Sequence, residues 1–384
     1  MLKETMTPME RITAAVEFKE VDRTPIVLGL SSPFLGRYKG MTPAEAYKHL
    51  DVVLKAEEEI WEEFGGWELR YGPVGLHDIG TTYPFGPTSW SIPRAMPGAE
   101  LPDYADVQNR EEEIMHEDEY QRLFNLGWMK FWVELVNRTY GGDYSSMITT
   151  DDSYLQRKMA KIAYWKEKHP LTETLYSPTV FDPVTMLATW RSAPRFMLDI
   201  CNQYDNVKKA IQDVIMPEFF ELYKKEAEMC NCKFVMVTGG VYQMPFVTEQ
   251  VFQDLQGDWI TDCTNLLLDM GKIPVFHLDG NWTDTLPWFK KFPKGKCVLH
   301  LDGGTDIAKA KELFEGHMCI MGDLSPVQLQ TYTTEEMKDY CEWLVREIGK
   351  DNGFIMCEGC FLSAHSQVEN VRTMVEVAKN YKPR

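Results

Sequence analysis

The stretch IPVFHLDGNW, from Ile273 to Trp282, decides the fold prediction. It opens with a short apolar run and ends in aspartate, glycine and asparagine, which are turn-forming residues. An apolar run of this length between turn signals is typical of a buried strand. The stretch KCVLHLDG, which begins at Lys296, has the same pattern. Because both runs are apolar at consecutive positions, they predict strands of a parallel sheet that is covered on both faces.

Further strands alternate with helices along the chain, which indicates βαβ units. The other predicted strands are KFVMVTG from Lys233, MCIMGDLS from Met318, GFIMCEGC from Gly353, TPIVLGL from Thr24 and ETLYSPTVFDP from Glu173. The predicted helices begin near Asp182 and Thr248, run from an N-cap at Thr305 to Gly316, and cover residues 334–348 and 367–380. Five late strands and at least two earlier ones favour a (β/α)8 barrel. No G-x-G-x-x-G motif follows the first strand, so a dinucleotide-binding fold has no support.

The segment from about Tyr71 to Tyr144 has a different composition. Its first part, GPVGLHDIGTTYPFGPTSWSIPRAMPG, is rich in glycine, proline and aromatic residues. An acidic helix is predicted to follow, with residues 110–113 near its start. We interpret residues 71–144 as an insertion, a lid over one end of the barrel, within a single domain of residues 1–384.

The composition narrows the function classes. The formal net charge of −18 disfavours binding to nucleic acid or to an anionic membrane. No apolar stretch is long enough to span a bilayer, and the N-terminus has no secretory signal, so we expect a cytoplasmic protein. The nine cysteines lie between Cys201 and Cys360 and are odd in number, which predicts reduced thiols rather than a disulfide framework.

Candidate site residues follow the ends of the late strands, where (β/α)8 barrels carry their catalytic groups. His277 and Asp279 stand two apart, so their side chains share one face of an extended segment. With Cys360, they would offer the imidazole, carboxylate and thiolate ligands that zinc binds tetrahedrally. A catalytic zinc takes three protein ligands and keeps its fourth position open. The sequence therefore predicts a metal site at His277, Asp279 and Cys360.

Structural readings of the same residues stay open. A lone histidine at a strand end is often structural, and Asp279 before Gly280 is a good turn former. The carboxylate could also orient the imidazole without binding the metal. Cys357 and Cys360 could form a redox pair. The remaining polar residues at strand ends are interpreted as structural. His300 is one of them, and Asp302 and Asp323 are interpreted as caps of the helices that follow.

These stretches together resemble the uroporphyrinogen decarboxylase superfamily. The resemblance covers most of the chain and is strongest from about Lys233 to the C-terminus. The matching pieces are DRTP (Asp22 to Pro25), HLDGN (His277 to Asn281), HLDGGTDIAKAKELFEG, MGDLSP (Met321 to Pro326), and GFIMCEGC followed by VENVRTMVEVAK. Members of the superfamily are single-domain, distorted (β/α)8 barrels, so the resemblance implies that fold.

The superfamily has two main branches. Decarboxylases act on a polycarboxylate porphyrinogen without a cofactor. Methyltransferases move methyl groups to or from a corrinoid cobalt and hold zinc with His-x-Cys and a later cysteine. Cys360 stands ten residues before Asn370, where methyltransferases have that cysteine and decarboxylases have a histidine. The segment LGLSSPFLGRYKG also lacks the Arg-Gln-Ala-Gly-Arg stretch with which decarboxylases bind carboxylates. The resemblance therefore implies the methyltransferase branch.

One position departs from the methyltransferase pattern. Asp279 stands where a cysteine is expected, so the implied zinc would be harder and more Lewis-acidic. We therefore expect zinc to assist a poor leaving group, with a methoxylated aromatic as the methyl donor and O-demethylation as the reaction. The expected acceptor is a corrinoid (a cobalamin) on a partner protein. The residues expected to bind the small-molecule substrate are Tyr83, Phe85, Trp90 and Arg37.

Three other functions stay open from the sequence. The first is a cofactor-free decarboxylase of the same fold, and the second is a methyltransferase that uses methylcobalamin and a thiol. The third is a barrel that binds a ligand without catalysis. The oligomeric state is open as well, with a homodimer among the options.

Overall fold

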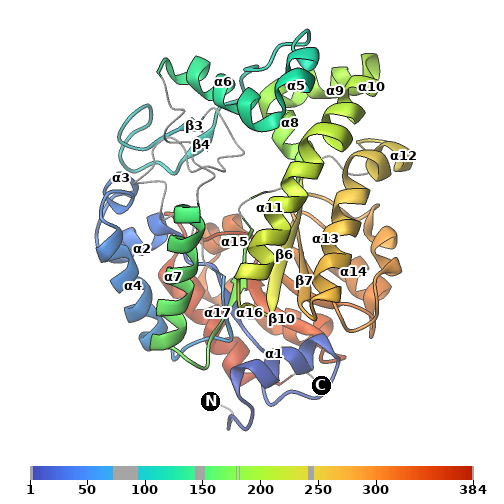
Figure 1. Cartoon of the computed structure of the whole chain (residues 1–384). Helices are drawn as coiled ribbons and strands as arrows, with labels where there is room; N and C mark the ends of the chain where they lie inside the picture. Colours follow the sequence, from blue (N-terminus) through green and yellow to red (C-terminus); the bar gives the residue numbers. More distant parts are fainter. Residues whose placement is uncertain are drawn as a thin grey trace.

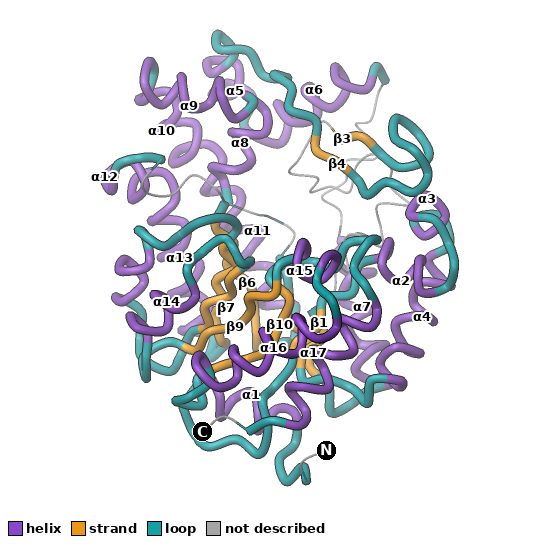
Figure 2. Tube along the Cα trace, turned by 180° about the vertical axis from the view of Figure 1, so that it is seen from behind, coloured by secondary structure: helices purple, strands orange, loops and turns teal. Residues whose placement is uncertain are grey.

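The chain forms a closed barrel of eight parallel strands (Figures 1 and 2). The computed structural model describes residues 3–71, 94–142, 152–178, 180, 182–240 and 246–382. In order around the barrel, the strands are β1 (Val27–Leu28), β2 (Leu69–Arg70), β5 (Glu173–Tyr176), β6 (Phe234–Gly239), β7 (Ile273–Leu278), β8 (Val298–Leu301), β9 (Cys319–Leu324) and β10 (Phe354–Glu358). A parallel bridge between Ile26 and Met356 joins β10 back to β1 and closes the ring. The predicted (β/α)8 fold is confirmed.

Helices surround the strands, as the alternation in the sequence predicts. They include α2 (Ser32–Tyr38), α4 (Leu50–Glu63), α7 (Asp152–Lys168), α11 (Met216–Met229), α13 (Asp258–Asp269), α14 (Ile307–Phe314), α16 (Thr334–Trp343) and α17 (Val368–Asn380). Two short helices, α12 (Glu249–Phe252) and α15 (Pro326–Thr331), begin soon after β6 and β9. In Figure 2, α16 and α17 cross in front of the strands, which places the sheet inside the helical layer.

Alternate residues of each strand belong to two different cores. Val275 on β7 and Val298 on β8 pack inside the barrel, whereas Phe276 and Leu299 pack between the sheet and the surrounding helices. Because successive side chains of a strand point to opposite faces, a residue two positions beyond Val275 or Val298 also faces the lumen. His277 and His300 occupy these positions, and they are register partners in the β7–β8 ladder. The pleat thus directs two neighbouring imidazoles into the mouth of the barrel.

A second layer of helices lies beyond the carboxyl ends of the strands (Figures 1 and 2). It contains α5 (Tyr120–Leu126), α6 (Trp128–Tyr140), α8 (Pro183–Arg191), α9 (Ala193–Asn202) and α10 (Tyr204–Lys209). Two separate segments of the chain supply this layer, one after β2 and one after β5. The first falls in the predicted insertion, whose described residues also form β3 (Arg94–Ala95) and β4 (Gln108–Asn109). Its function as a lid stays a prediction.

The predicted start of the acidic helix is wrong. Residues 110–113 are not helical, and α5 begins at Tyr120. The acidic side chains instead join the two segments of the upper layer. Glu113 Oε1 lies 2.5 Å from Arg191 Nη1, and Glu111 Oε1 accepts a hydrogen bond from Ala193 N at 2.6 Å. These tertiary partners hold the acids in a segment that is neither helix nor strand.

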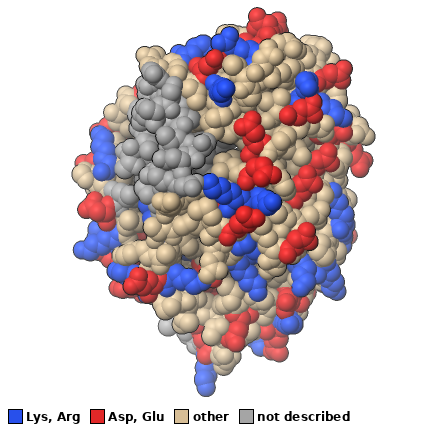
Figure 3. All heavy atoms as spheres, viewed as in Figure 1, with Lys and Arg blue, Asp and Glu red and all other residues tan. Residues whose placement is uncertain are grey.

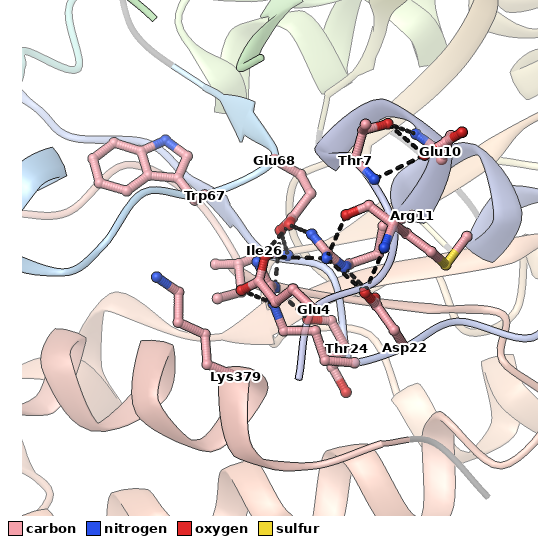
Figure 4. Close-up of polar contacts among 12 residues, drawn as sticks. Glu4, Thr7, Glu10, Arg11, Asp22, Thr24, Ile26, Trp67, Glu68 and Lys379 are labelled. Carbon is pink, nitrogen blue, oxygen red and sulfur yellow. Dashed lines mark hydrogen bonds and ion pairs between the residues drawn. The ribbon is translucent and has the colours of Figure 1, made fainter. Parts of the chain in front are cut away.

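A cluster of buried charges closes the opposite end of the barrel (Figure 4). Glu68, which precedes β2, accepts hydrogen bonds from Arg11 Nη1 at 2.5 Å, Arg23 Nη2 at 2.7 Å and Ile26 N at 2.7 Å. Arg11 lies on α1 (Pro8–Val16) and also donates to Asp22 Oδ1 at 2.6 Å. The cluster therefore fastens α1 to the start of the strands, at the end of a barrel that serves stability rather than chemistry.

The surface reflects the acidic composition. On the face drawn in Figure 3, lysine and arginine side chains form small groups between acidic ones. Among the helices in the described part of the chain, none combines the length and apolar character that crossing a membrane requires.

Candidate metal centre

The three predicted metal ligands come together at the mouth of the barrel. One ligand atom from each of His277, Asp279 and Cys360 lies within 4.8 Å of the other two. His277 Nε2 is 3.3 Å from Asp279 Oδ1. The imidazole is buried, whereas the Asp279 side chain is 38 % exposed and Cys360 is partly exposed. The group therefore has a closed side toward the barrel and an open side toward the mouth.

Tight turns place the two outer ligands. Asp279 directly follows β7, and its carbonyl oxygen accepts a hydrogen bond from Trp282 Nε1 at 2.9 Å. Cys360 follows Gly359, whose N–H donates to Leu324 O at 2.8 Å. A Cβ at Gly359 would lie 2.5 Å from backbone atoms of Asp302, so only glycine fits between the loops that follow β8 and β10.

The donor set suits zinc in both chemistry and spacing. Nitrogen, oxygen and sulfur ligands at 2.0–2.3 Å from a tetrahedral zinc lie about 3.3–3.8 Å from one another. The nitrogen-to-oxygen distance of 3.3 Å falls in this range. The three ligand atoms lie within 4.8 Å of one another, a limit about 1 Å above the longest separation expected around zinc. Rotation of the side chains accommodates a displacement of this size. The residues present therefore fit a zinc ion with three protein ligands.

A second histidine lies directly behind the first. His300 is fully buried, and its Nδ1 lies 2.9 Å from Nδ1 of His277. Its Nε2 lies 2.9 Å from the carbonyl oxygen of Glu358. The sequence interpretation of His300 as merely structural missed this contact with a candidate ligand. The available signal was the repeated H-L-D-G at the ends of two successive strands.

The charges of the site are strongly coupled. Burial lowers the pKa of His277, but the adjacent Asp279 carboxylate and Cys360 outweigh burial and raise this pKa to about 10. Burial by itself would raise the pKa of Asp279, but the attraction of the neighbouring His277 is stronger than the effect of burial. The pKa of the Asp279 carboxyl is therefore lowered. Burial, assisted by His277, lowers the pKa of His300 to about 3. In the protein without metal, a proton on His277 therefore supplies the positive charge that a cation would bring.

Two aromatic side chains form a wall beside the site. The buried Tyr71 ring lies edge-on to His277 and His300, with ring centroids 6.0 Å and 5.7 Å away. It stacks on the half-buried Phe361, at a centroid distance of 4.7 Å. The sequence pattern does not reveal this pair, because Tyr71 follows a strand of two residues and Phe361 is an ordinary loop residue in the sequence.

The predicted substrate-binding residues have other positions. Tyr83, Phe85 and Trp90 lie outside the described residues. Arg37 is exposed near the end of α2, and its Nη1 donates to Ala364 O at 2.9 Å. The structure therefore ties Arg37 to the loop after β10 and does not bring it into the group of three ligands.

The helix caps expected at strand ends are wrong in detail. Asp302 accepts hydrogen bonds from Gly280 N at 2.7 Å and Gly304 N at 2.8 Å. Asp323 Oδ1 accepts one from the hydroxyl of Tyr340 at 2.7 Å. The true caps of α14 and α15 are Asp306 and Ser325, so Thr305 is not a cap either.

Thr305 and Cys357 contribute in other ways. The Thr305 hydroxyl donates to Gly280 O at 3.0 Å and accepts from Trp282 N at 2.9 Å, so it joins the loops after β7 and β8. Cys357 faces the lumen as a free thiol, with its Sγ 3.7 Å from His300 Nε2. Cys360 is also a free thiol.

Comparison with known proteins agrees with the architecture. Residues 244–381 match the family model described as uroporphyrinogen decarboxylase (URO-D). The fold is similar to that of a solved structure, a methyltransferase from Methanosarcina mazei, with a TM-score of 0.67 and 16 % sequence identity. That likeness covers 98 % of this chain and 99 % of the other. No curated protein matches the sequence.

Proposed function

We propose that this protein is a corrinoid-dependent methyltransferase of the uroporphyrinogen decarboxylase superfamily. In this proposal, His277, Asp279 and Cys360 hold zinc, and a methyl group passes between a small molecule and the cobalt of a corrinoid on a partner protein. The observation that carries the proposal is the convergence of three different ligand atoms within 4.8 Å at the open end of the barrel.

Two comparisons support this choice without deciding it. The match of residues 244–381 to the URO-D model covers the segment that contains all three proposed ligands. The solved structure with a similar fold is named as a methyltransferase. A cysteine at position 360 also agrees with the methyltransferase pattern that the sequence resembles.

Each proposed ligand has a different role in the site. The chemistry that zinc supplies in such a site is Lewis acidity, which stabilises negative charge on a leaving oxygen. The buried imidazole of His277 fixes one ligand on a rigid strand, and Asp279 provides a hard oxygen ligand in place of a second thiolate. The partial exposure of Asp279 and Cys360 leaves the substrate side of the group accessible.

An aromatic methyl ether is the proposed donor. Its leaving group is a basic oxygen, which gains more from a hard Lewis acid than a thiol does. The half-buried Phe361, which stacks on the buried Tyr71, presents an aromatic face next to Cys360, against which a methoxylated ring can stack. The same surface excludes water from one side of the reacting group.

A decarboxylase is the second candidate, because the matching family model bears that name. A polycarboxylate substrate needs several cationic side chains at the mouth. The sequence offers two cations after the first strand: Arg37 donates to Ala364 O, and Lys39 pairs with Glu59. Incubation with a porphyrinogen and analysis of the products tests this alternative directly.

The metal content of the purified protein tests the proposed site. We expect about one zinc per chain in the wild type and little zinc in His277→Ala and Cys360→Ser. Cys201→Ser is the matched control, since Cys201 is an exposed cysteine on α9, and it should retain zinc. Negligible zinc in the wild type after reconstitution would exclude the site.

A methyl-transfer assay tests the reaction. The spectrum of a reduced corrinoid, followed in the presence of methoxylated aromatics, reports its methylation. We expect methylation that depends on all three ligands. Methyl transfer only when methylcobalamin and a thiol are supplied would instead favour the thiol-dependent reaction.

A further inference from the structure

The contact between His277 and His300 has a definite hydrogen-bond polarity. Nε2 of His300 lies 2.9 Å from the carbonyl oxygen of Glu358, which can only accept. His300 Nε2 must therefore carry a hydrogen. In a neutral imidazole, the other nitrogen, Nδ1, then has a free lone pair and acts as an acceptor.

The second contact follows from the first. His300 Nδ1 lies 2.9 Å from His277 Nδ1, and one of these nitrogens must donate. Since His300 Nδ1 is an acceptor, His277 Nδ1 carries the hydrogen. A doubly protonated His300 would reverse this polarity, but it would place the positive charge in a fully buried position, one imidazole farther from the Asp279 carboxylate.

The consequence reaches the ligand atom. With its hydrogen held on Nδ1, His277 has only Nε2 available for a metal, and Nε2 is the atom that lies 3.3 Å from Asp279 Oδ1. We infer that His300 is a positioning residue that holds His277 in the tautomer and ring orientation required for metal binding through Nε2. This inference deepens the proposed function and rests on its metal site.

The surroundings make the arrangement rigid. His277 and His300 are register partners on adjacent strands, so the β7–β8 ladder sets the distance between them. The ring of Tyr71 packs edge-on against both imidazoles. The Cys357 sulfur, at 3.7 Å from His300 Nε2, is a weaker and longer acceptor than the Glu358 carbonyl. The Glu358 carbonyl is therefore the partner that orients His300.

Two substitutions separate positioning from simple packing. His300→Phe keeps the ring volume and removes the acceptor, whereas His300→Asn places an amide oxygen near the position of Nδ1. We expect zinc affinity, measured by competition with a chromogenic chelator, to fall about 10- to 100-fold in His300→Phe. His300→Asn should recover most of that loss. His317→Phe, at a histidine outside the site, should leave zinc affinity unchanged.

Nitrogen-15 NMR of the histidine rings supplies a readout that packing alone does not move. In the wild type, with or without zinc, we expect a hydrogen on Nδ1 of His277 and on Nε2 of His300. In His300→Phe, the Nδ1–H of His277 has no acceptor, so its proton should lose the chemical shift of a hydrogen-bonded N–H. Circular dichroism and urea unfolding establish that each variant is folded.

The outcomes are distinguishable. A folded His300→Phe with wild-type zinc affinity would overturn the inference, and so would a wild-type His277 without hydrogen on Nδ1. If His300→Phe does not fold, the wild-type NMR assignment and the His300→Asn affinity still decide it. If the wild type binds no zinc, the proposed function fails. The NMR spectrum of the two histidine rings still shows separately whether His277 Nδ1 donates to His300 Nδ1.

Discussion

At the scale of single residues, Asp279 distinguishes this site from one with two thiolates. Its carboxylate oxygen is 3.3 Å from His277 Nε2, and it stands at the sequence position where the methyltransferase pattern that this chain resembles has cysteine. An oxygen ligand is harder than sulfur, so it would leave a bound metal more Lewis-acidic. Under the proposed function, the identity of this one atom bears on whether an oxygen leaving group or a thiol is activated.

Replacing Asp279 by cysteine should convert the proposed metal site from one thiolate ligand to two. We expect Asp279→Cys to bind zinc more tightly and to show about twice the sulfur-to-cobalt charge-transfer absorbance per bound Co(II), because two thiolates replace one. Methylation from an ether should slow relative to the wild type. Asp284→Cys adds a thiol at an exposed nearby position and should change neither property. An unchanged Co(II) spectrum in Asp279→Cys would mean that position 279 does not contact the metal.

Asp182 supports a prediction about pH. Its side chain is fully buried, and Oδ1 caps α8 by accepting from Thr185 N at 2.8 Å. In the described part of the chain, its Oδ2 has no hydrogen-bond partner. Burial raises its pKa to about 6, against about 3.9 for an aspartate in an unfolded chain.

The folded protein therefore binds more protons at Asp182 than the unfolded chain does between about pH 4 and pH 6. Stability falls as pH rises through this window, by about 3 kcal/mol in total, and the cost remains above it. Asp182→Asn keeps the cap and removes the charge. Urea unfolding should find this variant more stable than the wild type at pH 7 but not at pH 4. Asp205→Asn, at an exposed position, should show no such pH-dependent difference in stability. A stability difference between Asp182→Asn and the wild type that is the same at pH 4 and pH 7 would contradict a raised pKa of Asp182.

At the scale of elements, the loops after β7, β8 and β10 form one rigid rim. Asp302 and Thr305 link the β8 loop to Gly280, and Gly359 lies against the backbone of Asp302. Because these links are short and end on backbone atoms of Gly280 and Asp302, a shift in one loop must move the others. The rim therefore fixes the distance between Asp279 and Cys360 without any contact to a metal.

Gly359→Ala tests the rim. The added Cβ would lie 2.5 Å from Asp302 backbone atoms, which cannot rotate away. We expect a loss of stability of about 1–3 kcal/mol and lower zinc occupancy, because Cys360 is displaced. Gly271→Ala is the control, since nothing lies within 4 Å of its Cβ and its φ of +70° costs only backbone strain. That variant should lose about 1 kcal/mol and keep its zinc. Full occupancy in Gly359→Ala would show that the rim adapts.

The same elements show what the sequence could predict. Strands β6 to β10 are continuous apolar runs between turn residues, so period and composition identify them. By contrast, β2 contains only Leu69 and Arg70, and Arg70 is buried because Glu57 pairs with it from α4. That burial depends on a tertiary contact, which no local pattern reveals.

The site divides in the same way. Convergence of His277 and Cys360 follows from the barrel topology, because the carboxyl ends of parallel strands meet at one rim. The roles of Asp302 and Thr305 depend on loop geometry, and local capping rules gave the wrong partners for both. The His277–His300 contact depends on strand register, for which the repeated H-L-D-G is the available signal in the sequence.

At the scale of the whole molecule, the buried ion pairs around Glu68 and the proposed metal ligands lie at opposite ends of the barrel. The mouth holds the proposed ligands, and the other end holds the buried cluster around Glu68 (Figure 4). Neither end has a residue in common with the other. A change in the buried cluster should therefore affect how much protein is folded and not what the folded protein does.

Glu68→Gln tests this separation. Glu68 neutralises Arg11 and Arg23, whose side chains are both buried. The substituted glutamine would preserve the shape but leave Arg23 with only the half-exposed Glu4 as a counter-charge, whereas Arg11 keeps Asp22. Breaking a buried ion pair costs about 3–5 kcal/mol. We expect urea unfolding to register that loss, while zinc per folded chain stays at the wild-type value. Glu20→Gln removes an exposed ion pair with Lys382 and should change stability little. A Glu68→Gln protein that remains stable but loses zinc would show instead that the two ends are coupled through the strands between them.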